Sequence, residues 1–143
     1  ASGRGFLTTG VNIQYSPPPD GDGNYGVLQA IDLEKGEIAW ETRRRHTYDM
    51  GVLTTDGGVL FTGSTDRHIL AYDQATGTEL WRTAVTGMPN AAPITYAVDG
   101  KQYVAVVTGY GNPLSFGIPD VIPEMQMPPV NSSAIYVFAL PDE

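Results

Sequence analysis

Hydrophobic and β-branched residues occur along this chain in short runs, which glycine, proline, aspartate and asparagine interrupt. No segment repeats its apolar residues with the 3.6-residue period of a long helix. Short runs bounded by turn residues predict antiparallel strands joined by tight hairpins. The predicted strands are residues 5–13, 27–32, 37–43, 51–55, 59–63, 68–73, 79–85, 92–97, 103–108 and 134–140. The pattern therefore predicts an all-β fold.

Two of the predicted hairpins contain an aspartate–glycine pair, at Asp56-Gly57 and at Asp99-Gly100. A tight hairpin needs a residue with positive φ, which glycine adopts at low cost because it has no Cβ. We therefore expect a turn at each pair, with the glycine in the left-handed conformation.

One stretch of the sequence occurs twice. Residues 30–40 read AIDLEKGEIAW and residues 71–81 read AYDQATGTELW, so Ala, Asp, Gly and Trp recur 41 positions later (81 − 40). A period of about 40–45 residues with four strands per unit is typical of a propeller blade, because one small sheet cannot bury both faces alone. A weaker copy follows in residues 92–140.

Each repeated residue has an expected structural role. The Asp accepts hydrogen bonds from backbone amides of the following turn, and the Gly takes a positive φ at the end of that turn. The Trp offers a flat surface of about 150–250 Å², which is large enough to pack between adjacent sheets. We expect Trp40 and Trp81 to pack in this way.

The repeat, Ala-x-Asp-x-x-Thr-Gly-x-x-x-Trp, resembles the tryptophan docking motif of the PQQ-dependent (quinoprotein) alcohol and glucose dehydrogenases, which are eight-bladed β-propellers. The first copy has Lys35 in place of the Thr. Residues 51–66, 92–106 and 138–141 are similar, in the same order, to the last two blades and the ending of these enzymes.

This resemblance implies a partial β-propeller of about two and a half four-stranded antiparallel blades. Residues 1–44 would form the end of one blade and residues 45–85 one complete repeat. Residues 86–143 would form the last blade, with a long loop at 109–131. A loop of this size is often functional.

The resemblance also implies a chemistry. In this family PQQ lies in a central channel with a Ca²⁺ or lanthanide ion, and an Asp acts as catalytic base while an alcohol or sugar is oxidised. The family's base and metal ligands belong to segments upstream of this chain, so no catalytic and no metal-binding residue is assigned here. Asp49 and Met50 match a family segment that touches the quinone edge, and they are the predicted cofactor contact. An exposed blade-connecting loop is the alternative.

Charge and composition narrow the choice of partners. Acidic residues outnumber basic ones 16 to 8, and the formal net charge of −8 argues against a nucleic-acid surface. The basic run at 43–45 is expected to be a solvated strand end, and His46 and His68 are expected to be structural. The absence of cysteine removes disulfides and thiolate metal sites. No apolar run approaches the roughly 20 residues of a membrane-spanning helix.

Two functions stay open. The first is a PQQ-dependent dehydrogenase that acts on an alcohol or a sugar, passes electrons to an acceptor and, by resemblance, works in the periplasm. The alternative is a non-enzymatic propeller that serves as a binding scaffold of the outer-membrane assembly type. In either case, open sheet faces and unpaired edges predict that the isolated chain associates with itself or with the remaining blades of a propeller.

Overall fold

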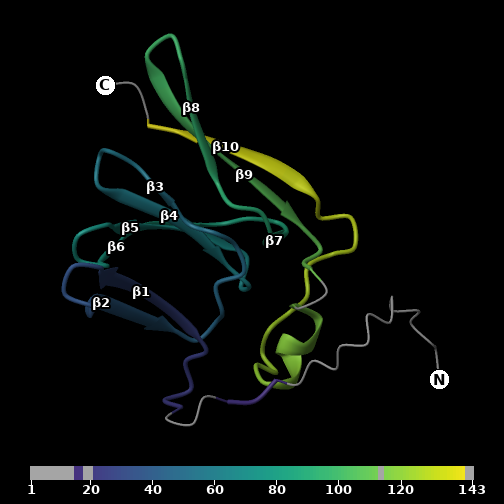
Figure 1. The fold of residues 1–143 in the computed structure, drawn as a ribbon. Coiled ribbons are helices and arrows are strands. Elements are labelled where there is room, and N and C mark those ends of the chain that lie inside the picture. The colour runs from purple at the N-terminus through teal and green to yellow at the C-terminus, as the bar shows by residue number, and fades with distance from the viewer. Residues whose placement is uncertain (1–14, 18–20, 113–114, 141–143) are drawn as a thin grey trace, which may run out of the picture.

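The computed structural model describes residues 15–17, 21–112 and 115–140, and it confirms the all-β prediction. Figure 1 shows three sheets stacked one above another in chain order. No described helix is long and apolar enough to cross a membrane. The elements are β1 Gly26–Asp32, β2 Glu37–Arg44, β3 Leu53–Thr54, β4 Val59–Ser64, β5 His68–Asp73, β6 Glu79–Ala84, β7 Met88–Pro89, β8 Ile94–Val98, β9 Lys101–Gly109, the 3₁₀ helix η1 Ser115–Asp120, and β10 Ala134–Ala139.

Neighbouring strands are antiparallel in all three sheets. The first sheet contains β1 and β2. The second has the order β3-β4-β5-β6. In the third, β9 pairs with β10 on one side, and on the other side it pairs first with β8 and then with the short β7. The predicted strand 5–13 lies outside the described residues.

The two copies of the repeat form the same tight turn, as predicted. The Oδ1 atom of Asp32 accepts hydrogen bonds from the amides of Glu34 and Lys35, and the Oδ1 atom of Asp73 accepts them from the two equivalent amides. Gly36 and Gly77 close these turns with φ of +68° and +71°. The first aspartate–glycine turn differs from the prediction, because Gly58 rather than Gly57 takes the positive φ.

The core consists of layers between the sheets. Because side chains alternate along a strand, β5 contributes to both layers. Leu70 and Tyr72 are buried toward the first sheet, beside Trp40. Ile69 is buried toward the third sheet, beside Val104 and Val106. The middle sheet therefore has both faces covered, as a blade inside a stack requires.

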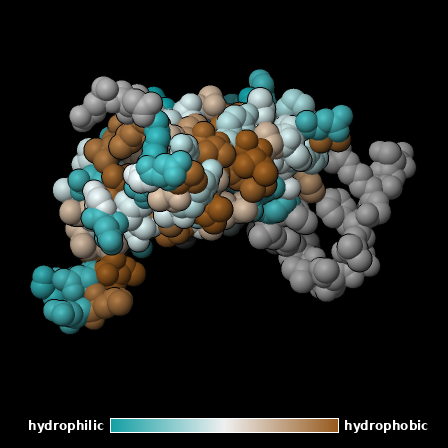
Figure 2. All heavy atoms as spheres, turned by 90° about the horizontal axis from the view of Figure 1, so that it is seen from above, coloured by the Kyte–Doolittle hydropathy of each residue, from teal (hydrophilic) through white to brown (hydrophobic). Residues whose placement is uncertain are grey.

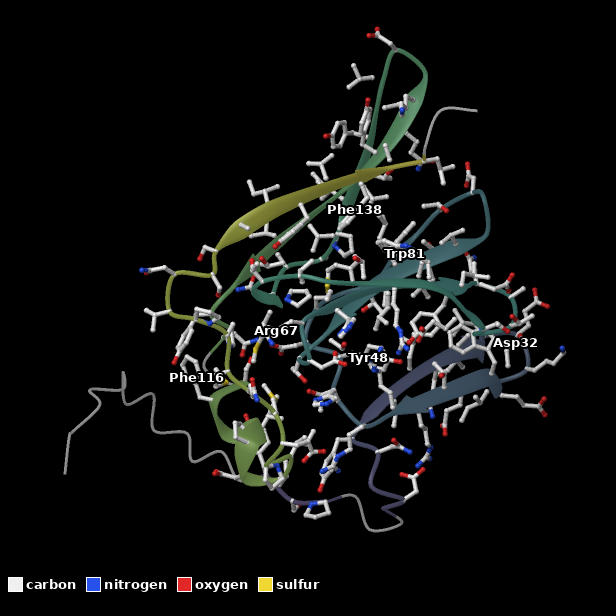
Figure 3. The ribbon with its side chains drawn as sticks, turned by 180° about the vertical axis from the view of Figure 1, so that it is seen from behind. Asp32, Tyr48, Arg67, Trp81, Phe116 and Phe138 are labelled. Carbon is white, nitrogen blue, oxygen red and sulfur yellow. The ribbon has the colours of Figure 1, made fainter. Side chains whose placement is uncertain are left out.

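The two repeated tryptophans both lie between sheets. Trp40 of β2 lies against Gly77 of the next sheet, and its Nε1 atom donates a hydrogen bond to the carbonyl of Gln74 at 3.0 Å. Trp81 of β6 meets Phe138 of the third sheet edge to face, with ring centroids 5.3 Å apart. Figure 3 shows Trp81 and Phe138 facing each other between the two sheets. Each sheet is thus joined to the next by an aromatic contact.

Candidate functional site

Four connecting segments gather at one end of the stacked sheets. They are residues 45–52 between β2 and β3, the turn 65–67 between β4 and β5, residues 85–93, and the long segment 110–133 between β9 and β10. Thr65 donates its amide hydrogen to the Thr47 carbonyl at 2.9 Å, and Tyr48 forms a β-bridge with Ser64. These contacts hold the first two segments side by side. The predicted cofactor contact, at Asp49 and Met50, therefore lies at this end.

The carboxylate of Asp49 is half-buried and binds the long segment. Its Oδ1 atom accepts a hydrogen bond from Nδ2 of Asn112 at 2.9 Å, and its Oδ2 atom accepts one from the Ser115 hydroxyl at 2.6 Å. Burial, and to a smaller extent the negative charge of Asp49, raises the pKa of Tyr15. The sequence alone did not identify Asn112 or Ser115, which are 63 and 66 residues away. The only signal was the unusual length of the segment that carries them.

The side chain of Met50 is half-buried and packs against the layer between the second and third sheets. A Cβ atom on Gly63 would lie 2.4 Å from the Met50 sulfur and 2.6 Å from Cβ of Pro89, so only glycine fits there. The backbone of β4 is therefore in close contact with Met50. This packing fixes the position of the thioether group, while part of the side chain stays exposed.

The long segment has a small core of its own. Ile118, Ile122 and Met125 are buried against Met88, which belongs to the third sheet. Met125 is thus a packing residue, and Met127 packs against the same cluster. Within the described residues, no group of three or more His, Cys, Asp or Glu side chains is placed to hold a metal ion. The long segment is a folded cap on this end of the stack.

All three consecutive arginines bind carboxylates, and Arg44 is the one that corrects the expectation of a solvated strand end. Arg44 donates from Nη2 to Asp66 at 3.0 Å, and its side chain is only 15% exposed. Burial works to raise the pKa of Asp66, but the Ser64 hydroxyl and the positive charge of Arg44 outweigh it and hold that pKa below its usual range. The two residues come from different sheets, so this ion pair links the first sheet to the second.

Arg45 makes the corresponding link to the long segment. It binds both carboxylate oxygens of Glu124, and its guanidinium lies 5.1 Å from the centre of the Tyr25 ring. The hydrogen bonds from Arg45 lower the pKa of Glu124 to about 2. Arg43 has 42% of its side chain exposed. It binds Glu41, two residues away on the same strand.

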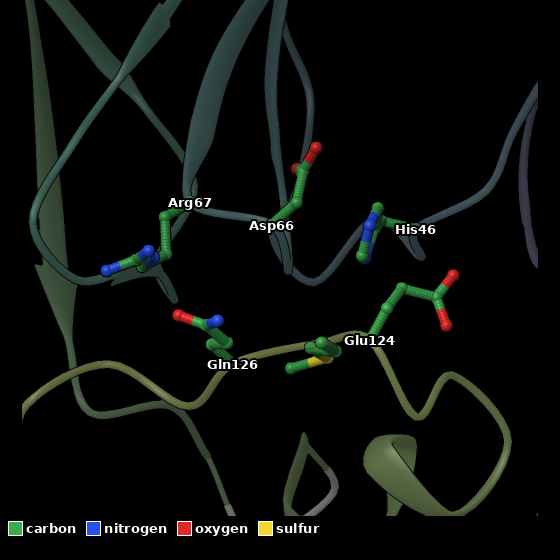
Figure 4. A pocket seen from close by; sticks show the side chains of 6 residues that line it. His46, Asp66, Arg67, Glu124 and Gln126 are labelled. Atoms are coloured by element: carbon green, nitrogen blue, oxygen red, sulfur yellow. The ribbon is translucent and has the colours of Figure 1, made fainter.

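A shallow pocket of about 180 Å³ opens between the turn at Asp66 and the long segment. His46, Arg67, Glu124 and Gln126 line it together with Asp66 and Met125, as Figure 4 shows. Burial lowers the pKa of His46, so the imidazole is neutral near pH 7. The carboxylates of Asp66 and Glu124 are both bound by arginines. Both carboxylates of this pocket are therefore held in ion pairs.

Known proteins are similar to this chain in sequence and in fold. The family model described as "PQQ: Glucose/ethanol/alcohol dehydrogenase, beta-propeller domain" matches residues 7–104. The chain belongs to this family. It is 34% identical over 120 residues to the quinoprotein alcohol dehydrogenase PedE of Pseudomonas putida, and 37% identical over 110 residues to the quinohemoprotein alcohol dehydrogenase of Comamonas testosteroni. These matches cover 84% and 77% of this chain, and 19% and 15% of the two relatives.

Solved structures of this family share the fold. The chain is similar to a europium-containing methanol dehydrogenase, with a TM-score of 0.72 and 30% identity over 83% of this chain and 24% of that protein. It is also similar to the quinohemoprotein alcohol dehydrogenase of Comamonas testosteroni, with a TM-score of 0.63 and 32% identity over 79% of this chain and 16% of that protein. The stacked sheets are thus blades of a β-propeller that is not closed within this chain. The chain spans about a fifth of the length of the curated relatives it matches.

Proposed function

We propose that this chain forms the last blades of a longer PQQ-dependent dehydrogenase that oxidises an alcohol or a sugar. The observation that carries the proposal is the family membership together with the likeness to a methanol dehydrogenase. We further propose that residues 1–44, 45–85 and 86–143 are the successive blade units, and that the parent protein works in the periplasm. The relatives quoted above are dehydrogenases, so the scaffold alternative is not favoured.

In the proposed enzyme, PQQ with its Ca²⁺ or lanthanide ion supplies the electron-accepting quinone, and a separate electron acceptor then reoxidises it. The catalytic base and the metal ligands are proposed to lie upstream, as the family resemblance implies. This chain's contribution is to support one edge of the cofactor site. A half-buried thioether such as that of Met50 suits contact with a flat conjugated ring, because sulfur is polarisable and is attracted to aromatic edges. We propose the segment Asp49–Met50 for that contact.

The outer face of the third sheet is proposed to contact another propeller sheet. Ile135 and Val137 of β10 lie on this face opposite Val107 and Ala105 of β9, and Ile94 of β8 is also opposite Ala105. Figure 2, a view from above, shows hydrophobic side chains gathered across the middle of the face that is turned upward in Figure 1. A further blade of the parent would cover this surface, and in the isolated chain a second copy would do so.

The experiment compares this chain with its full-length parent. Both are loaded with PQQ and either Ca²⁺ or La³⁺, and turnover is measured with primary alcohols, glucose and an artificial electron acceptor. We expect turnover in the parent and none in the isolated chain. Turnover in neither protein would favour the scaffold alternative, and turnover in the isolated chain would contradict the placement of the base and metal ligands upstream.

The same preparation tests the proposed contact. Met50→Leu keeps the volume of the side chain but removes the sulfur, so PQQ should bind the parent several-fold more weakly. Met125→Leu is the matched control, because Met125 is buried in the core of the long segment. Equal PQQ affinity in the two variants would contradict a contact at Met50.

A further inference from the structure

The carboxylate of Asp49 joins two segments that are far apart in the sequence. Asp49 precedes the first strand of the second sheet, whereas Asn112 and Ser115 follow β9 of the third sheet. Both carboxylate oxygens are used, at 2.9 Å to Nδ2 of Asn112 and at 2.6 Å to the hydroxyl of Ser115. Each oxygen keeps a further acceptor site, but both are already bound by residues of the long segment. The structure thus assigns to this carboxylate a link between the two segments.

The long segment forms a turn whose side chains bind Asp49. The backbone amide of Ser115 donates to the backbone carbonyl of Asn112 at 3.0 Å, and the backbone amide of Asn112 donates to the Ser115 hydroxyl at 3.3 Å. Ser115 is completely buried. Gly111 has a φ of +111°, and a Cβ atom there would lie 3.0 Å from the Met88 sulfur. This turn therefore holds the side-chain amide of Asn112 and the hydroxyl of Ser115 side by side, where both bind Asp49.

The chemistry of the two partners favours an aspartate. Nδ2 of Asn112 and the hydroxyl of Ser115 both donate, and an ionised carboxylate accepts both bonds with the added strength of its charge. An asparagine at position 49 would have to donate to the Ser115 hydroxyl, and both bonds would lose the contribution of the charge.

We propose that Asp49 is a positioning residue that latches the long segment 110–133 onto residues 45–52 and so fixes Met50 at the edge of the cofactor site. The part of the proposal that concerns the cofactor rests on the proposed function. The latch itself rests only on the contacts of Asp49, and it can be tested without cofactor.

The latch is tested by hydrogen exchange in the full chain. Asp49→Asn and Ser115→Ala should each raise amide exchange at residues 115–122 by about tenfold, because each removes a partly buried hydrogen bond to a charged group. In the double variant the two effects should not add, as expected for residues in direct contact. Asp120→Asn is the matched control, since this exposed carboxylate lies in the same 3₁₀ helix. Unchanged exchange in Asp49→Asn, or full additivity in the double variant, would overturn the latch.

The positioning role is tested by PQQ affinity in the parent protein. Asp49→Asn should weaken PQQ binding several-fold, whereas Asp120→Asn should not change it. Faster exchange with unchanged PQQ affinity would overturn the positioning role and leave the proposed function intact. A parent protein that neither binds PQQ nor turns over would contradict the proposed function, and the exchange rates would still decide the latch.

Discussion

At the scale of single residues, the fold depends on a few positions where a side chain meets a backbone at close range. The clearest is Gly77, where a Cβ atom would lie 2.4 Å from the ring of Trp40. Gly36 is the equivalent residue of the first turn, and a Cβ atom there would meet nothing within 4 Å. The two glycines have nearly the same φ, at +71° and +68°. Substitutions at the two positions therefore distinguish the cost of the backbone conformation from the cost of the contact with Trp40.

Alanine at these two positions should have different costs. Gly36→Ala should lower the free energy of unfolding by about 1–2 kcal/mol, the cost of a left-handed conformation with a Cβ. Gly77→Ala should lower it by a further amount of about 1–3 kcal/mol, because the methyl group displaces Trp40 from its site. Urea unfolding of both variants measures the difference. Equal losses would show that Trp40 does not pack on this turn.

The sequence predicted the residues of the repeated turns, but it did not predict the residues that bind Asp49 in the candidate site. Asp73, Gly77 and Trp40 were predictable because they repeat, and a repeated residue has the same local cause in each copy. Asn112 and Ser115 lie in a segment without a counterpart in the first repeat, so no local pattern marked them. The distances of 63 and 66 residues to Asp49 also placed them beyond short-range rules. Whether Asp49 and Met50 touch a cofactor stays a prediction.

At the scale of elements, the strands followed the sequence pattern where they pair in a regular ladder. The differences occur where the chain is not held by a regular ladder. The strand predicted at 51–55 is reduced to Leu53–Thr54, because its first residues follow the loop that carries Met50. The short strand Met88–Pro89 and the 3₁₀ helix Ser115–Asp120 were not predicted. Both elements contain proline, and the 3₁₀ helix also contains glycine, so the sequence pattern did not indicate them. Tertiary contacts rather than local propensity stabilise them.

The stability of the long segment should depend on pH through the ion pair between Glu124 and Arg45. The pKa of Glu124 is lowered from 4.5 to about 2 by Arg45. A lowered carboxyl pKa contributes stability that is fully present above pH 4.5 and is lost as the pH falls toward 2. Glu124→Gln should therefore lower the melting temperature at pH 6, and its difference from the unsubstituted chain should shrink between pH 4.5 and 2. Thermal unfolding across this range measures the effect.

Glu34→Gln is the control for this titration, because Glu34 lies in the exposed turn between β1 and β2. Its melting curves should follow those of the unsubstituted chain at every pH. A difference between Glu124→Gln and the unsubstituted chain that persists unchanged at pH 2 would contradict the ion pair with Arg45.

At the scale of the whole molecule, the stack of sheets has a covered middle and an uncovered end. The middle sheet packs on both neighbours. The third sheet packs on the middle sheet with one face, while Ile135 and Val137 on the other face are 71% and 51% exposed. Large exposed apolar patches on a sheet mark a surface that another protein surface covers. The central claim is that the chain is a run of consecutive propeller blades whose stack another sheet continues.

Sedimentation velocity of the isolated chain, measured up to roughly 50 µM, tests this claim most directly. We expect association that increases with concentration in the unsubstituted chain and is strongly reduced by the double variant Ile135→Lys and Val137→Lys. Leu33→Lys is the matched control, since Leu33 is 90% exposed at the tip of a turn and should not alter association. A stable, soluble monomer over the whole range, or association that the double variant leaves unchanged, would contradict the claim.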